Sequence, residues 1–163
     1  MPNLFIDADN CPLYPEVIRA AQRHALEVYV VTRDFLCVDD NVHLILAQDD
    51  GVGGSEWIAA NISYGDICVT GERALAVSCL MQAAVALEPT GRPWSVDAVT
   101  AGLVGAMGGV SLKPSKPAQA WAEDTRTFAR RLDTAITKTR AAKARPAFSP
   151  SSPISIDFAR AAL

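Results

Sequence analysis

The fold of this chain is decided close to its amino terminus, by the stretch Asn3-Leu4-Phe5-Ile6-Asp7-Ala8-Asp9. Its first four residues form a short apolar run that is typical of a buried strand, and the two aspartates after it indicate a turn. Runs of the same kind predict further strands at Val28–Val31, His43–Leu46, Ile67–Thr70 and Ala84–Leu87.

Helical patterns fill the intervals between these strands. Pro12 and Pro15 allow a helix to start before the second strand. Ser55 is expected to be the N-cap of a helix that runs through Ile62, and a third helix is expected over Ala74–Met81. Apolar strands that alternate with helices predict an α/β fold: a three-layer, doubly wound, mainly parallel sheet of about five strands.

The carboxyl-terminal third carries one more helix and then changes composition. Trp121, Phe128, Leu132 and Ile136 recur at helical spacing, opposite a basic side. We therefore expect one domain over residues 1–145, which ends in this helix, and an extended tail over residues 146–163. The tail is rich in Pro and Ser, and its alternating Ile154, Ile156 and Phe158 could pair with a sheet edge of the same chain or of a neighbour. The latter would make a homodimer.

Composition and the amino terminus favour a cytoplasmic protein without a membrane partner. Of the 163 residues, 50% are hydrophobic and 20% are charged, and no apolar run reaches the length of a membrane span. The first residues lack the basic segment that opens a secretion signal. The four cysteines, which contain no CxxC pair, are expected to be small buried hydrophobic residues: Cys11, Cys37, Cys68 and Cys79.

The net charge of -3 conceals two regions of opposite sign. Residues 1–112 hold 14 acidic and 5 basic side chains, whereas residues 113–145 hold 3 acidic and 9 basic ones. An acidic body beside a basic segment suits a metal-dependent protein that acts on nucleic acid. It equally suits a basic helix that docks on its own acidic body.

The acidic residues that follow strands predict a metal site. Ligands bind beyond the carboxyl ends of parallel strands, where the strand order reverses, and we expect the first and fourth strands to flank that point. Asp7 and Asp9 leave the first strand there, Thr70 and Glu72 leave the fourth, and Glu56 opens a helix nearby. Carboxylates that converge need a cation, and oxygen ligands favour Mg²⁺ or Mn²⁺. Asp66 begins its strand, so it is expected at the opposite edge as a turn residue.

Several motifs resemble those of the bacterial YaiI/YqxD family, also called UPF0178 or DUF188. The string Phe5-Ile6-Asp7-Ala8-Asp9-Asn10-Cys11-Pro12 looks like the family's Asp-Ala-Asp-x-Cys-Pro opening. The segment from Gly65 to Ala76 and the turn Ala86-Leu87-Glu88-Pro89-Thr90-Gly91 resemble two later blocks, and Gly108-Gly109 falls at the family's Gly-Gly-Pro loop. The resemblance covers roughly residues 3–140 and implies a PIN-like fold with metal-dependent nuclease activity.

Together these features make a nuclease that acts on RNA or DNA the leading hypothesis. Asp7, Asp9 and Glu72 are the candidate catalytic residues, and with Glu56 they are the candidate metal ligands. Asn10, Ser55, Thr70 and Arg33 are the candidates for binding substrate, with RNA favoured as the nucleic acid. Glu72 stands where the family usually has Asp, and Arg33-Asp34 stands where it usually has Asn-Gln. Such departures favour the alternative, a module that binds nucleic acid or protein without cutting.

Two other chemistries fit parts of the same sequence. An Asp7-x-Asp9 pair after a strand resembles a haloacid-dehalogenase-type phosphatase, in which the first Asp attacks phosphorus. That class needs a downstream lysine, yet no lysine precedes Lys113. The glycine-rich stretch from Asp50 to Ser55 could bind a phosphate at a helix start, or it could be a flexible turn.

Overall fold

The protein is described by a computed structural model that covers residues 1–47, 51–97, 99–100 and 125–144. Its centre is a five-stranded, fully parallel sheet with the strand order β3-β2-β1-β4-β5. The strands are β1 (Asn3–Asp7), β2 (Glu27–Thr32), β3 (Val42–Leu46), β4 (Ile67–Val69) and β5 (Val85–Leu87). The predicted α/β class and the five strands are confirmed, with boundaries that differ by one residue at most of the ends.

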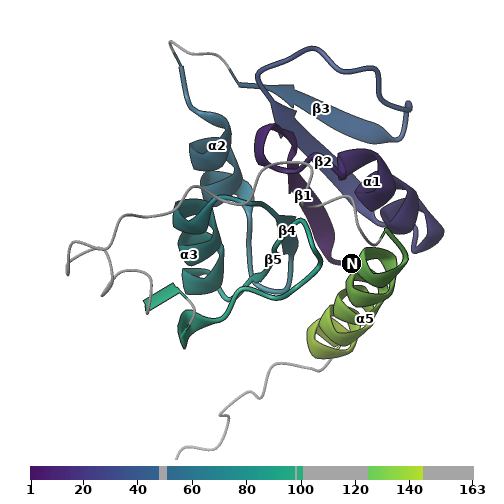
Figure 1. Ribbon diagram of the computed structural model, residues 1–163, viewed down its shortest axis with the longest axis vertical. Coiled ribbons are helices and arrows are strands. Elements are labelled where there is room, and N and C mark those ends of the chain that lie inside the picture. The colour runs from purple at the N-terminus through teal and green to yellow at the C-terminus, as the bar shows by residue number, and fades with distance from the viewer. Residues whose placement is uncertain (48–50, 98, 101–124, 145–163) are drawn as a thin grey trace, which may run out of the picture.

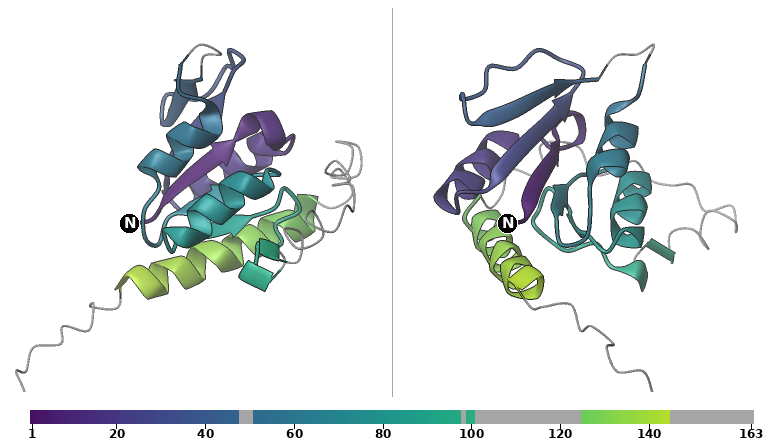
Figure 2. Two further views of the ribbon diagram at one scale, coloured as in Figure 1. Left: turned by 90° about the vertical axis from the view of Figure 1, so that its left-hand side faces the viewer. Right: turned by 180° about the vertical axis from the view of Figure 1, so that it is seen from behind.

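Helices cover both faces of this sheet and make the three layers (Figure 1). Helices α1 (Tyr14–Arg23) and α5 (Thr125–Ala144) lie on one face, and α2 (Gly54–Asn61) and α3 (Arg73–Met81) lie on the other. The two views of Figure 2 show the same arrangement from the side and from behind. A short 3-10 helix, η1 (Ala8–Asn10), directly follows β1.

The two-residue repeat of the strands explains why both faces are apolar. Along β1, Leu4 and Ile6 point into the core under α1 and α5, whereas Phe5 points into the core under α2 and α3. Phe128, Leu132 and Ile136, spaced four residues apart on α5, are buried against the first of these cores. The predicted apolar side of this helix is therefore confirmed for these three residues.

The chain order reverses between β1 and β4, as predicted. From β1 the chain moves outward to β2 and β3, and it then returns so that β4 lies on the other side of β1, with Phe5 opposite Cys68. The carboxyl ends of two adjacent strands thus diverge to helices on opposite faces. This leaves an opening above β1 and β4 in which ligands of such sheets bind.

Local corrections concern a cap and a cysteine. Gly53, not Ser55, is the N-cap of α2, so Ser55 lies within the first turn of the helix. Cys37 is exposed, whereas Cys11, Cys68 and Cys79 are buried as expected. Trp121, Gly108-Gly109 and the tail of residues 146–163 lie outside the described residues. None of the described helices has the length and apolar composition that crossing a bilayer requires.

Candidate functional site

An open cleft of about 840 Å³ lies at the carboxyl edge of the sheet, above the point where the order reverses. Its walls come from η1 and the ends of β1 and β2 on one side, and from α2 and the start of α3 on the other. The predicted site residues that line it are Asp7, Asp9, Asn10, Arg33, Ser55, Glu56 and Glu72. Thr70 lies beneath them, fully buried.

Asp7 is the most enclosed acid of the cleft, with only 5% of its surface exposed. Its Oδ2 accepts hydrogen bonds from Thr70 Oγ1 at 2.6 Å and from Asn10 Nδ2 at 2.9 Å. Burial raises the pKa of this carboxyl, helped by the charges of Glu72 and Asp9, although the two hydrogen bonds oppose that rise. Oδ1 receives no hydrogen bond from the described residues.

Asp9 is held by the end of β2 on both of its oxygens. Thr32 Oγ1 donates to Oδ1 at 2.8 Å, and the backbone N–H of Arg33 donates to the same oxygen at 3.2 Å. The Arg33 side chain donates from Nε to Oδ2 at 3.1 Å, which makes an ion pair. Arg33 lies at the cleft, where a phosphate could reach it, but in this structure it neutralises Asp9 instead.

Glu72 reaches the same cleft from the segment between β4 and α3. Its Oε2 accepts a hydrogen bond from Ser55 Oγ, which joins the first turn of α2 to the start of α3. The backbone N–H of Glu72 donates to Thr70 Oγ1 at 2.9 Å. Thr70 therefore positions two acids at once, since its hydroxyl donates to Asp7 and accepts from Glu72.

Glu56 has a structural partner as well as a place on the cleft wall. Its Oε2 accepts a 2.8 Å hydrogen bond from the N–H of Gly53, the residue that caps α2. This is the return half of a capping box, in which an acid in the first helical turn satisfies the cap backbone. The cap therefore engages Glu56, which the sequence had suggested as a metal ligand.

Asp66 lies at the opposite edge of the sheet, as predicted, and it has a larger role than a turn residue. It is 1% exposed and accepts hydrogen bonds from the backbone N–H of Asn3, from Ser63 and from Lys143 Nζ at 3.0 Å. Burial favours the neutral acid, but these hydrogen bonds outweigh it and lower the pKa of Asp66. It therefore anchors β1, the β4 turn and α5 to one another.

Three further residues support the cleft although the sequence did not single them out. Thr32, which holds Asp9, ends β2 next to Arg33, and its position at a strand end was the available signal. Trp94 donates from its indole N–H to the carbonyl of Thr70 at 3.1 Å. At Gly71 a Cβ would lie 2.8 Å from the Asn10 carbonyl oxygen, so this close approach of two loops requires glycine.

The donors that the described residues bring to the cleft fit a magnesium-type site better than a zinc or structural calcium site. Among the described residues, no three acidic, histidine or cysteine side chains stand close enough to form a complete cage. Zinc and structural calcium sites need such cages. Mg²⁺ keeps several waters and is held by one or two carboxylates together with substrate phosphates. Asp7, Glu56 and Glu72 each have one oxygen that receives no hydrogen bond from the described residues. The charge of Glu72 acts on Asp7, so these two acids provide that smaller set.

Comparisons with known proteins agree on one family. Residues 5–138 match the family model described as "Uncharacterized BCR, YaiI/YqxD family", known as DUF188. A UPF0178 protein of Azorhizobium caulinodans is 35% identical over 91 residues, or 55% of this chain and 57% of that protein. The UPF0178 protein Rru_A0086 of Rhodospirillum rubrum is 36% identical over 99 residues, or 59% and 66%.

A third relative aligns over a longer stretch. The UPF0178 protein R01393 of Rhizobium meliloti is 36% identical over 106 residues, or 64% of this chain and 71% of that protein. For the first relatives the match spans less than two thirds of their own length. No solved structure matches the chain. Because the family model covers most of its residues, the chain belongs to the YaiI/YqxD (DUF188) family.

Proposed function

We propose that the protein is a metal-dependent nuclease of the PIN-like kind, which hydrolyses phosphodiester bonds in RNA or DNA. The observation that carries this proposal is that Asp7, Asp9, Glu56 and Glu72, which come from three separate parts of the sequence, line one open cleft. That cleft stands where the strand order reverses. The PIN-like part of the proposal rests in addition on the resemblance of the opening Asp-Ala-Asp motif to that of the family.

The oxygens that accept no hydrogen bond from the described residues indicate which acids would bind the metal ion directly. Asp7 Oδ1 and Glu72 Oε1 would hold Mg²⁺ or Mn²⁺ directly, while Asp9 and Glu56, already engaged by Arg33 and the α2 cap, would act through water. A divalent ion in this position supplies polarisation of the phosphate and a lower pKa for water. Thr70 and Asn10 fix the Asp7 carboxylate, and Ser55 fixes that of Glu72.

Arg33 gives the cleft its affinity for a phosphate. It is the cation among the described residues that line this cleft, and its side chain is 65% exposed. Because it lies beside Asp9, an incoming phosphate would compete with that carboxylate for the guanidinium group. A phosphatase of the haloacid-dehalogenase type is less well supported, since no lysine is among these lining residues.

The direct test is cleavage of a labelled single-stranded RNA with and without Mn²⁺. We expect Mn²⁺-dependent cleavage that Asp7→Asn abolishes and that the matched control Asp40→Asn leaves intact, since Asp40 is exposed and does not line the cleft. Calorimetry should detect Mn²⁺ binding to the control and not to Asp7→Asn. Absence of Mn²⁺ binding at millimolar concentration would contradict the proposal.

A second candidate is a module that binds nucleic acid or protein without cutting it. The observation in its favour is the full engagement of Asp9, whose two oxygens accept three hydrogen bonds from Thr32 and Arg33. If RNA binds equally well to the wild type and to Asp7→Asn and neither cleaves it, this candidate replaces the nuclease.

A further inference from the structure

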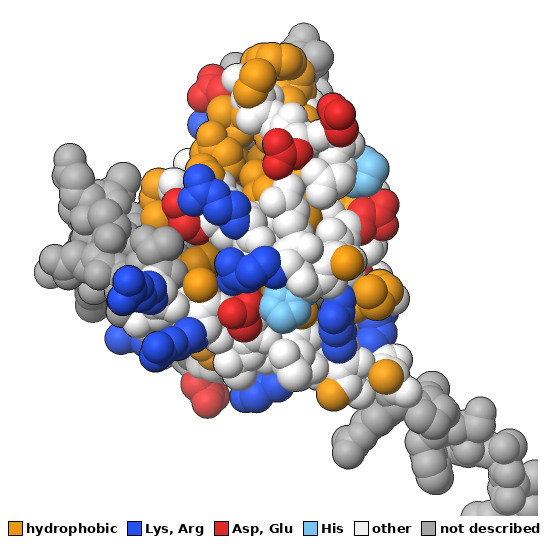
Figure 3. Space-filling view, turned by 90° about the vertical axis from the view of Figure 1, so that its right-hand side faces the viewer, with side chains coloured by type: hydrophobic (Ala, Val, Ile, Leu, Met, Phe, Trp, Pro, Cys, Tyr) orange, Lys and Arg blue, Asp and Glu red, His pale blue; other side chains and the backbone are white. Residues whose placement is uncertain are grey.

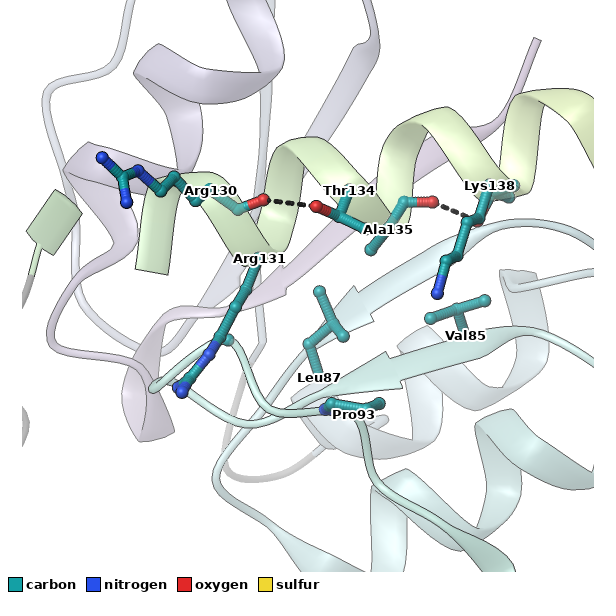
Figure 4. A pocket seen from close by; sticks show the side chains of 10 residues that line it. Val85, Leu87, Pro93, Arg130, Arg131, Thr134, Ala135 and Lys138 are labelled. Atoms are coloured by element: carbon teal, nitrogen blue, oxygen red, sulfur yellow. Dashed lines mark hydrogen bonds between the residues drawn. The ribbon is translucent and has the colours of Figure 1, made fainter. Parts of the chain in front are cut away.

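A second concavity lies between β5 and α5, on the face of the sheet that α1 and α5 cover (Figure 4). It measures about 330 Å³, near the lower end of the sizes that ligand pockets have. Val85, Leu87 and Pro93 form its floor, and Ala135 of α5 faces them from above. We call this concavity the β5–α5 groove.

Basic side chains surround this apolar floor. Figure 4 shows Lys138 and Arg131 extending from α5 down toward β5 at the two ends of the groove, while Arg130 extends along the outer side of the helix. No acidic side chain is among the described residues that line the groove. The Lys and Arg side chains spread over the α5 region are also visible on the molecular face in Figure 3.

These cations retain donors for a ligand. Arg131 gives one N–H to the carbonyl of Thr90 at 3.1 Å, which leaves the rest of its guanidinium group available. Arg130 and Lys138 are exposed, and no described residue pairs with either side chain. The hydroxyls of Thr134 and Thr139 donate to carbonyls of their own helix. The cations are therefore the main hydrogen-bond donors that the groove offers a ligand.

One turn of the chain, residues 88–92, has neighbours beside both the groove and the cleft. On one side of this turn, a Cβ at Gly71 would lie 3.6 Å from Pro89 Cγ, next to the cleft residue Asn10. On the other side, a Cβ at Gly91 would lie 3.0 Å from Arg131 Cβ. The turn contains one acid, Glu88, which accepts a hydrogen bond from Thr90. A strand that occupied both sites would pass over this turn.

We propose that the β5–α5 groove is a second binding site for single-stranded nucleic acid, with bases on the apolar floor and phosphates paired with Arg131, Lys138 and Arg130. The proposal rests on the proposed function for its choice of polymer. Arg131 and Lys138 are seven residues apart, which is about 10 Å along a helix. That distance corresponds to roughly three stacked nucleotides. Stacking on apolar or aromatic surfaces beside cations is how single strands are bound without sequence preference.

The experiment measures the anisotropy of a fluorescein-labelled U12 oligonucleotide in EDTA, where no metal-dependent step can occur. We expect the double variant Arg130→Gln/Lys138→Gln to bind about fivefold or more weakly at 50 mM salt. Its salt dependence should also decrease by about 1.4 in log–log slope, the loss of two phosphate contacts. The control Arg19→Gln/Arg23→Gln removes the same charge from α1, together with surface ion pairs to Glu16 and Asp133, and should change affinity less than twofold.

Three results would overturn the proposal. One is an equal loss of affinity in the control, which would indicate a general charge effect. Another is binding of an abasic oligomer or of polyglutamate as tightly as U12, because neither has bases to lie on the floor. The third is a set of ¹⁵N-edited spectra in which U12 leaves the amides of residues 130–139 unshifted. Cleavage that persists with these amides unshifted would reject the groove alone, whereas shifted amides without any cleavage would reject the nuclease alone.

Discussion

Thr70 donates a 2.6 Å hydrogen bond to Asp7 and thereby joins the carboxyl ends of β4 and β1 beneath the cleft. The same hydroxyl accepts the N–H of Glu72. Two acids that are 65 positions apart in the sequence are thus oriented by one buried side chain. Under the proposed function, Thr70 would therefore link the stability of the fold to the affinity for a metal ion.

Replacing Thr70 with valine keeps the shape of the side chain and removes the hydroxyl. We expect Thr70→Val to lower the free energy of unfolding by about 1–3 kcal/mol, because it leaves buried polar partners without their hydrogen bonds. Mn²⁺ affinity should fall as well, since Asp7 loses its orientation. Urea unfolding and calorimetry measure the two effects. Thr137→Val, on the exposed side of α5, is the control and should be nearly neutral.

The substitution Arg33→Gln tests whether the ion pair with Asp9 matters for metal binding and not for the stability of the fold. The Arg33 side chain is largely exposed and Asp9 keeps its other hydrogen bonds, so loss of the ion pair should change the free energy of unfolding by no more than about 0.5 kcal/mol. Release of Asp9 from a cation should strengthen Mn²⁺ binding severalfold, while binding of RNA in the cleft weakens. Arg19→Gln, which breaks a comparable surface pair with Glu16, should alter neither. Unchanged Mn²⁺ affinity in Arg33→Gln would contradict a shared site.

Asp66 makes stability depend on pH at the far edge of the sheet. Its pKa in the folded protein lies below the ordinary value of 3.8, so the unfolded chain binds more protons as the pH falls past that value. The contribution of Asp66 is therefore complete above pH 3.8 and is lost as the pH falls through the lower, folded pKa. Urea unfolding of wild type and Asp66→Asn at several pH values should show a difference that shrinks with acidification. A difference that is constant with pH would contradict the lowered pKa.

Gly71 should tolerate no side chain. The Cβ of Gly71→Ala would stand 2.8 Å from a backbone oxygen of Asn10, and backbone cannot move aside as a flexible side chain can. We expect a loss of about 1–3 kcal/mol, the usual cost of overpacking, together with displaced cleft residues. Thermal unfolding tests the first effect and Mn²⁺ calorimetry the second. Wild-type values for both would mean that the loop around Asn10 yields freely.

The sheet could be predicted from sequence because each strand is a compact apolar run with its own boundary signals. The alternation of Leu4, Phe5 and Ile6 between two cores is a local property of β geometry. The reversal of strand order between β1 and β4 also followed, because right-handed crossovers allow few alternatives.

The partners of the polar residues could not be predicted in the same way, because they depend on distances of a few ångströms between remote segments. Arg33 was expected at a phosphate and lies against Asp9; Ser55 was expected at a helix cap and donates to Glu72. The N-cap is Gly53 and not Ser55 because the N–H of Gly53 donates to the side chain of Glu56. Asp66 was predicted to be only a turn residue, because its partner Lys143 follows 77 positions later and no local pattern indicates the contact.

The late position of α5 in the chain has a consequence for biosynthesis. Phe128, Leu132 and Ile136 close the core beneath α1, and Lys143 reaches back to the start of β4. While the ribosome is still producing these residues, α1 is the described helix that covers this face of the sheet, and the part of the apolar core that α5 closes stays open to water. The nascent chain therefore exposes apolar surface until α5 emerges, and premature termination before residue 125 would leave an aggregation-prone fragment.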